Sequence, residues 1–110
     1  MIMDLKEAEQ IFNTLNNSQH QQFFKSVLNS AVRYSRLRVD WYLSDQEQQI
    51  EMDEERTIAH NAFISACDIL SRNMKAAGDD NQWRVKIGTD RKSIGDFACL
   101  INAIIGIKAR

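Results

Sequence analysis

The chain has 110 residues, 44% of them hydrophobic and 26% charged, and its formal net charge is −1. This size and composition are typical of one soluble globular domain, residues 1–110. The balanced charge argues against a nucleic-acid-binding protein, which usually carries a basic surplus, and no apolar run approaches the roughly 18 residues of a membrane span.

The first ten residues, MIMDLKEAEQ, are too acidic for an export signal, so we expect a cytoplasmic protein. In that compartment Cys67 and Cys99 are expected to be reduced and packed rather than joined in a disulfide. Two cysteines and two histidines that are scattered along the chain form no zinc motif, and nothing else in the sequence calls for a metal or a cofactor.

Long helices are favoured throughout, because the chain has no proline and only 4 glycines. Asp4 followed by Glu7 is typical of a first helix start. The hydrophobic periodicity then predicts four helices and a short fifth one, with approximate bounds 4–16, 19–43, 45–77, 81–87 and 90–106.

The predicted breaks between helices rest on caps. Ser18 with Gln21 and Ser44 with Glu47 have capping-box spacing. Without a break near 43–45, residues 19–77 would form one improbably long helix. We therefore expect an all-α, four-helix bundle-like fold, built on a long antiparallel hairpin of 19–43 against 45–77.

Arg38 lies in the middle of the apolar arc of helix 19–43, at a position where the pattern asks for an apolar side chain. When the chain folds back near residues 44 and 45, Arg38 comes to lie opposite Glu51. We therefore expect Arg38 to pair with a carboxylate from residues 51–55, as a structural ion pair rather than a binding group.

Asp53, Arg56 and His60 share one flank of helix 45–77, about one turn apart, and Asp90 starts the last helix. Together with Arg38 these groups could hold a small anion. The alternative, which we favour for His60, is a purely structural role between helices. Gly95 lies inside the last helix, where it costs up to about 1 kcal/mol relative to alanine, so we expect close packing there against Trp83 or helix 19–43.

Trp41 and Tyr42, near the predicted hairpin end, suit either the core or an interface. The first and last helices are too short to cover both sides of the hairpin. The apolar length left exposed predicts a homodimer, or else another protein partner.

The stretches RTIAHNAFI and DRKSIGDFACLINAIIGIKAR, with the tryptophan between them, resemble a small family of bacterial helical proteins of unknown function. The family is associated with Gram-positive genomes and mobile elements. The resemblance spans about residues 33–110, implies a helical fold and supplies no activity. It rests on the following residues: Arg56, Thr57, His60, Asn61, Trp83, Asp90, Arg91, Ile94, Gly95, Asp96 and Phe97.

These patterns favour a non-catalytic helical interaction or assembly protein, and we expect no enzyme. The alternative is a small-molecule or anion-binding protein, even an unrecognised enzyme, that uses the following residues: Arg38, Asp53, Arg56, His60 and Asp90. A nucleic-acid partner comes third, and would need the following residues on one face: Arg33, Arg36, Lys86, Arg91 and Lys92. Convergence of the first set on an open hollow would favour the binding alternative.

Overall fold

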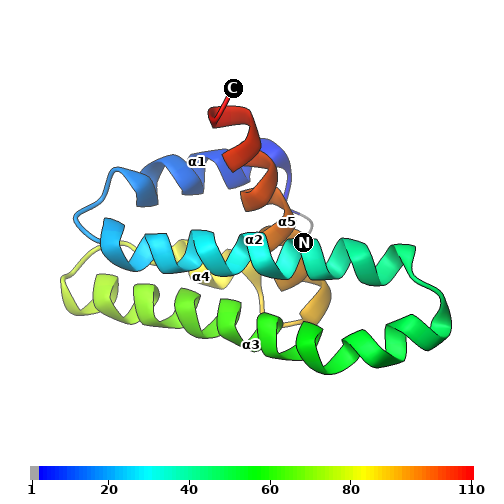
Figure 1. The fold of residues 1–110 in the computed structure, drawn as a ribbon. Helices are drawn as coiled ribbons and strands as arrows, with labels where there is room; N and C mark the ends of the chain where they lie inside the picture. Colours follow the sequence, from blue (N-terminus) through cyan, green and yellow to red (C-terminus); the bar gives the residue numbers. More distant parts are fainter. Residues whose placement is uncertain (1–2) are drawn as a thin grey trace.

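The computed structural model describes residues 3–110, and within them the chain forms five helices and no strand (Figure 1). The all-α prediction is therefore confirmed. The helices are α1 (Leu5–Asn16), α2 (Gln21–Leu43), α3 (Gln46–Ala76), α4 (Gln82–Ile87) and α5 (Arg91–Lys108).

The two long helices, α2 and α3, lie side by side and run in opposite directions (Figure 1). α2 packs most extensively against α3 and next most against α5. α5 also contacts α1, and the short α4 links α3 to α5. The N-terminal half of α2 is thus surrounded by other helices, whereas its C-terminal end has only α3 beside it.

The break between α2 and α3 lies where the sequence predicts it, but the cap is one residue later. Asp45, not Ser44, accepts the Gln48 backbone N–H at 2.9 Å, and the Gln48 side chain returns the bond to the Asp45 N–H. Ser44 instead ends α2, because its hydroxyl donates to the Asp40 carbonyl at 2.6 Å. The side chain of Ser44 is thereby occupied, which leaves the carboxylate of Asp45 to cap α3.

The capping box predicted at Ser18 is wrong. α2 starts after His20, and no side chain caps it. Ser18 forms a turn instead, donating to the Leu15 carbonyl at 2.8 Å and accepting from the His20 N–H at 3.1 Å. His20 also bonds to Asp79 at 2.7 Å, which joins the start of α2 to the segment after α3.

One apolar core connects all five helices. Trp83 and Ile87 of α4 are buried in it. Cys67 is buried as well, and both cysteines are free thiols. The largest fully buried side chains are Tyr34, Phe24, Phe63, Phe97, Leu15, Leu70, Ile101, Ile104, Val27 and Cys67.

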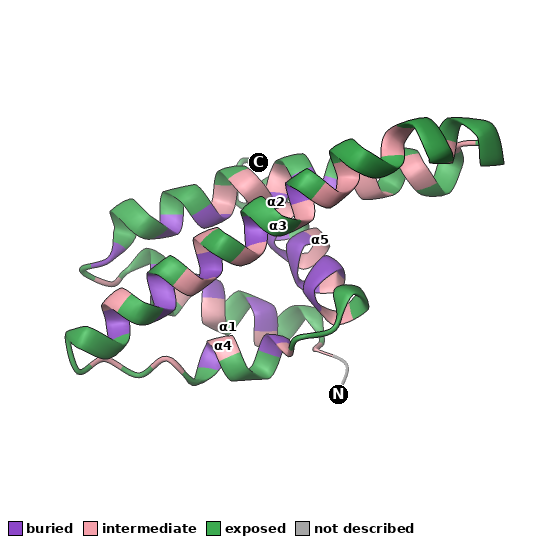
Figure 2. Cartoon of the chain, turned by 90° about the horizontal axis from the view of Figure 1, so that it is seen from below, coloured by how far each residue is buried: buried purple, intermediate pink, exposed green. Residues whose placement is uncertain are grey.

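The end of the α2–α3 pair projects beyond this core. The described residues span 47 × 30 × 27 Å with a radius of gyration of 14.1 Å, against about 13 Å for a compact chain of this length. Figure 2 shows buried positions along the body and only exposed or intermediate ones over the last turns of the projecting end. None of the helices in the described part of the chain is both apolar enough and long enough to cross a membrane.

The cap assignment predicts unequal effects of two neighbouring alanine substitutions. Asp45→Ala should lower the free energy of unfolding by about 1 kcal/mol, because it leaves backbone N–H groups of α3 without their acceptor. Ser44→Ala should lower the free energy of unfolding by only a few tenths of about 1 kcal/mol, because the hydrogen bond that is lost is exposed and uncharged. Urea unfolding monitored by circular dichroism measures both, and an Asp45→Ala cost no larger than that of Ser44→Ala would contradict the assignment.

Candidate functional site

Arg38 is held by α5 and not by α3. Its guanidinium donates to Asp96 Oδ1 at 2.9 Å and contacts Cys99 Sγ at 3.6 Å. The Arg38 side chain is only 15% exposed, so an ion pair is what burial of its charge requires. The predicted partner from residues 51–55 is therefore wrong, although the prediction of a paired arginine is right.

The error has a simple geometric cause. The apolar arc of α2 faces two neighbours, not one. Tyr34 and Trp41 lie on the α3 side, where Tyr34 packs edge-on against the ring of His60 with 5.3 Å between centroids. Ser35 and Arg38 lie on the other side of the arc, and both contact Cys99 of α5. Knowing that α3 folds back on α2 therefore does not determine which residues of the arc contact α3 and which contact α5.

Gly95 makes this contact possible. A Cβ atom at that position would lie 2.9 Å from both Cζ and Nε of Arg38, closer than real Cβ contacts allow. The close packing that the sequence predicts at Gly95 is therefore found, and its partner is α2. The cost of a glycine inside a helix is offset by the space it leaves for the guanidinium.

Arg56 of α3 has a different environment. Its guanidinium lies over the ring of Trp41, with Cζ 4.1 Å from the ring centroid. Its Nε atom is buried and has no hydrogen-bond partner within residues 3–110, and no carboxylate of this part of the chain makes a salt bridge with it. Stacking thus fixes the position of the Arg56 guanidinium and leaves its charge uncompensated.

Around Arg56 the surface forms a hollow of about 310 Å³, which we call the basic hollow. Arg91, at the start of α5, donates to Thr57 Oγ1 at 3.3 Å on its rim. The lining contains four cations, three aromatic rings and no acidic side chain: Tyr34, Arg38, Trp41, Tyr42, Arg56, Arg91 and Lys92. The basic hollow is therefore a site of strongly positive potential with apolar walls.

Of the five candidate residues, only Arg38 and Arg56 meet in the basic hollow. Asp53 lines a separate surface hollow next to Trp41. Asp90 is the N-cap of α5, accepting from the Ser93 N–H at 3.0 Å, and these bonds hold the pKa of Asp90 below its ordinary value. The five residues therefore do not converge as one acid–base cluster.

His60 packs into the protein beside Tyr34 and does not line the basic hollow. Burial lowers the pKa of His60, and the positive charges of Arg91 and Arg56 lower it further, against a hydrogen bond with Asn61 that raises it. Two of the three arginines that line the basic hollow, Arg56 and Arg91, thus act electrostatically on His60.

Sequence reasoning did not place Trp41, Arg91 and Lys92 in this site together. Nothing in their spacing could have done so, since Arg91 and Lys92 are distant from Trp41 in the sequence and only the packing of α5 against the other helices brings them beside it. The five residues of the nucleic-acid alternative do not share a face either. Arg36 lies two residues, and so about 160°, round α2 from Arg38, on an exposed side of the helix.

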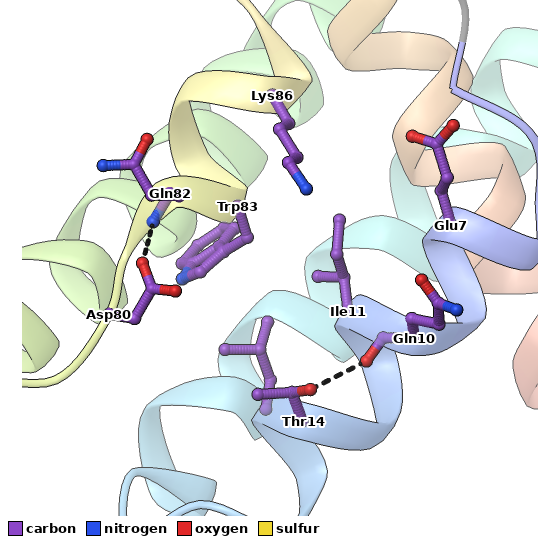
Figure 3. Close-up of a pocket in the computed structure, with 9 residues that line it drawn as sticks. Glu7, Gln10, Ile11, Thr14, Asp80, Gln82, Trp83 and Lys86 are labelled. Atoms are coloured by element: carbon purple, nitrogen blue, oxygen red, sulfur yellow. Dashed lines mark hydrogen bonds between the residues drawn. The ribbon is translucent and has the colours of Figure 1, made fainter.

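A second cavity, of about 250 Å³, lies between α1 and α4 (Figure 3). Trp83 forms one wall with its Nε1 buried and unpartnered by described residues, and Lys86 points across the cavity towards α1. Glu7 carries the opposite charge, and Asp80 accepts from the Gln82 N–H at 2.9 Å. Because its charges are mixed, this cavity favours no single ionic ligand.

The effect of Gly95→Ala on stability should have opposite signs in the natural sequence and in the Arg38→Ala variant. In the natural sequence, Gly95→Ala should lower the free energy of unfolding by about 1 kcal/mol, since the displaced charged hydrogen bonds outweigh the gain in helix propensity. With Arg38→Ala also present, the same change should stabilise by up to about 1 kcal/mol. Chemical denaturation of the four proteins tests this, and a Gly95→Ala effect that is equal in both backgrounds would refute the contact.

The lowered pKa of His60 predicts a loss of stability in weak acid. The unfolded chain protonates near pH 6.5 whereas the folded protein resists protonation, so this contribution is present above pH 6.5 and is lost as the pH falls through the folded pKa. His60→Gln should therefore lose less stability than the natural protein between pH 7 and pH 5. Urea midpoints at the two pH values measure this, and parallel losses in the two proteins would count against it.

The chain gives no match to protein-family models, to curated proteins or to solved structures. The bacterial family resemblance of residues 33–110 thus stays a prediction, and the functional argument rests on the geometry of the site.

Proposed function

We propose that this protein is a small, non-catalytic helical interaction module that forms a homodimer through the end of its α2–α3 hairpin. In this proposal the fold is four-helix bundle-like, with α2 and α3 as an antiparallel hairpin, and the protein acts in the bacterial cytoplasm. The observation that carries the proposal is the apolar surface of that end, the hairpin tip, formed by Val39, Tyr42, Leu43 and Ile50.

Large apolar side chains are unusually exposed at the hairpin tip. Tyr42 is 65% exposed, Leu43 82%, and Ile50 72%. Val39, Tyr42 and Leu43 have the i, i+3, i+4 spacing of one helix face, so they form a continuous stripe rather than scattered contacts. Contiguous apolar surface of this kind is typical of a protein–protein contact.

The hairpin tip continues a face that is buried lower down. Ser35 is buried against Cys99 of α5, and Tyr42 lies seven residues, or about two turns, further along nearly the same line of α2. What changes between them is α5, which covers this face of α2 as far as Arg38 through Asp96 and Cys99 and goes no further. The hairpin tip thus carries apolar side chains typical of a helix–helix interface, but no helix of the described chain covers them.

A second copy of this chain suits the tip in charge as well. The outer side of α2 exposes Arg33 and Arg36, and the first turns of α3 expose Glu47, Glu51 and Glu54, all without an ion pair in the described chain. An interface related by a two-fold axis must be complementary to itself. The arginines of α2 and the glutamates of α3 supply both signs of charge along the pair, although Asp40 of α2 is also exposed close to the tip.

A non-catalytic role fits the arrangement of the polar groups. Asp53 and His60, which could act as acid and base, do not face the same hollow as Arg56. General acid–base chemistry needs its groups within hydrogen-bond reach of one substrate.

Light scattering on a sizing column tests the proposal directly. At tens of micromolar the natural protein should have twice the 12.7 kDa mass of one chain. Leu43→Lys should weaken the dimer by about a hundredfold, because each of two symmetric contacts loses the burial of a leucine. Its matched control is Val85→Lys on α4, where an equally exposed apolar side chain lies outside the hairpin tip.

A monomeric natural protein would contradict the proposal, and so would a dimer that Val85→Lys disrupts as strongly as Leu43→Lys. Circular dichroism of both variants shows whether each remains folded.

A further inference from the structure

We propose that the basic hollow binds a phosphate monoester group. This site adjoins the hairpin tip and shares Tyr42 with it, but the inference does not depend on the proposed self-association.

The charges of the basic hollow are the first argument. Arg38 has a carboxylate partner in Asp96, but Arg56, Arg91 and Lys92 have none within salt-bridge distance in residues 3–110. Three cations that converge without an acid repel one another, and a bound anion would remove that repulsion. Their charge matches a phosphate dianion better than a carboxylate, which one arginine can satisfy.

The donors are also held in place before any ligand arrives. Arg56 is stacked on Trp41, with Cζ 4.1 Å from the ring centroid, and Arg91 is tethered to Thr57 at 3.3 Å. Donors that are already ordered lose less entropy on binding than free surface side chains. The Nε of Arg56 is itself buried, so a ligand in the basic hollow would be bound by the terminal nitrogens of the guanidinium, which make no salt bridge in residues 3–110.

The size and walls of the basic hollow indicate an organic phosphate. At about 310 Å³ it is at the lower end of the range for small-molecule sites, larger than a phosphate group alone would fill. Tyr34, Trp41 and Tyr42 supply the rings beside the cations, and Tyr42 is largely exposed. A sugar or a planar ring attached to the phosphate would contact these walls.

Isothermal titration with three probes at matched ionic strength tests the inference: inorganic phosphate, ribose 5-phosphate and AMP, with sodium chloride as the blank. We expect saturable binding of at least one phosphate probe. Tighter binding of AMP than of ribose 5-phosphate would identify ring contacts, whereas equal affinities would confine recognition to the phosphate group; both results support the site. No saturation by any of the three probes would overturn it.

Matched charge-neutral variants locate the binding. Arg56→Gln and Arg91→Gln should each weaken the best probe by at least about tenfold, the loss expected for one charge-assisted hydrogen bond. Arg36→Gln removes the same charge from an exposed position of α2 outside the hollow, and should change the affinity by less than about twofold because of salt screening. Equal weakening by all three variants would mean diffuse attraction to the net charge and would refute the site.

Leu43→Lys separates this inference from the proposed dimer. If this variant is monomeric and still binds phosphate, the two sites are independent, as we propose. If the natural protein is monomeric yet binds phosphate in the manner described, only the proposed function fails. If phosphate binding disappears with the dimer while Arg56 and Arg91 remain, a complete site requires two copies and the present inference is wrong.

Discussion

The packing of α5 against α2, in which Arg38 pairs with Asp96 beside an apolar contact, determines where both surfaces of the protein lie. Gly95 leaves room for the guanidinium of Arg38, which lies where a Cβ atom would otherwise be and reaches both Asp96 and Cys99. A largely buried arginine in an apolar arc is costly unless it is paired, so the contact also restricts the register of α5 on α2.

Two surfaces follow from that register. The start of α5 comes to lie beside Arg56, so that Arg91 and Lys92 join it around the basic hollow. Beyond this point α5 is absent, and the apolar face of α2 continues uncovered into the hairpin tip. The same helix position therefore produces a cationic site and an exposed apolar end, side by side around Trp41.

The helices and their breaks were readable from the sequence, because caps, glycines and periodicity are local signals. Asp4 and Asp90 both act as N-caps in the structure, as the sequence predicts. The partner of Arg38 could not be predicted from the sequence. The apolar arc of α2 contacts two helices, and only the tertiary packing determines which of them Arg38 faces. The basic hollow was predicted only in part: the sequence names Arg38 and Arg56 as candidates for binding an anion, and only the fold brings Trp41 and Lys92 beside them.

A double-mutant cycle tests the central role of the Arg38–Asp96 pair most directly. Arg38→Met and Asp96→Asn, alone and combined, should show a coupling of about 1 kcal/mol in urea unfolding, at the upper end for a pair with one exposed member. The parallel cycle of Arg38→Met with Glu51→Gln should show a coupling near zero. A coupling near zero for Asp96, or a larger one for Glu51, would contradict this account of how α5 is placed.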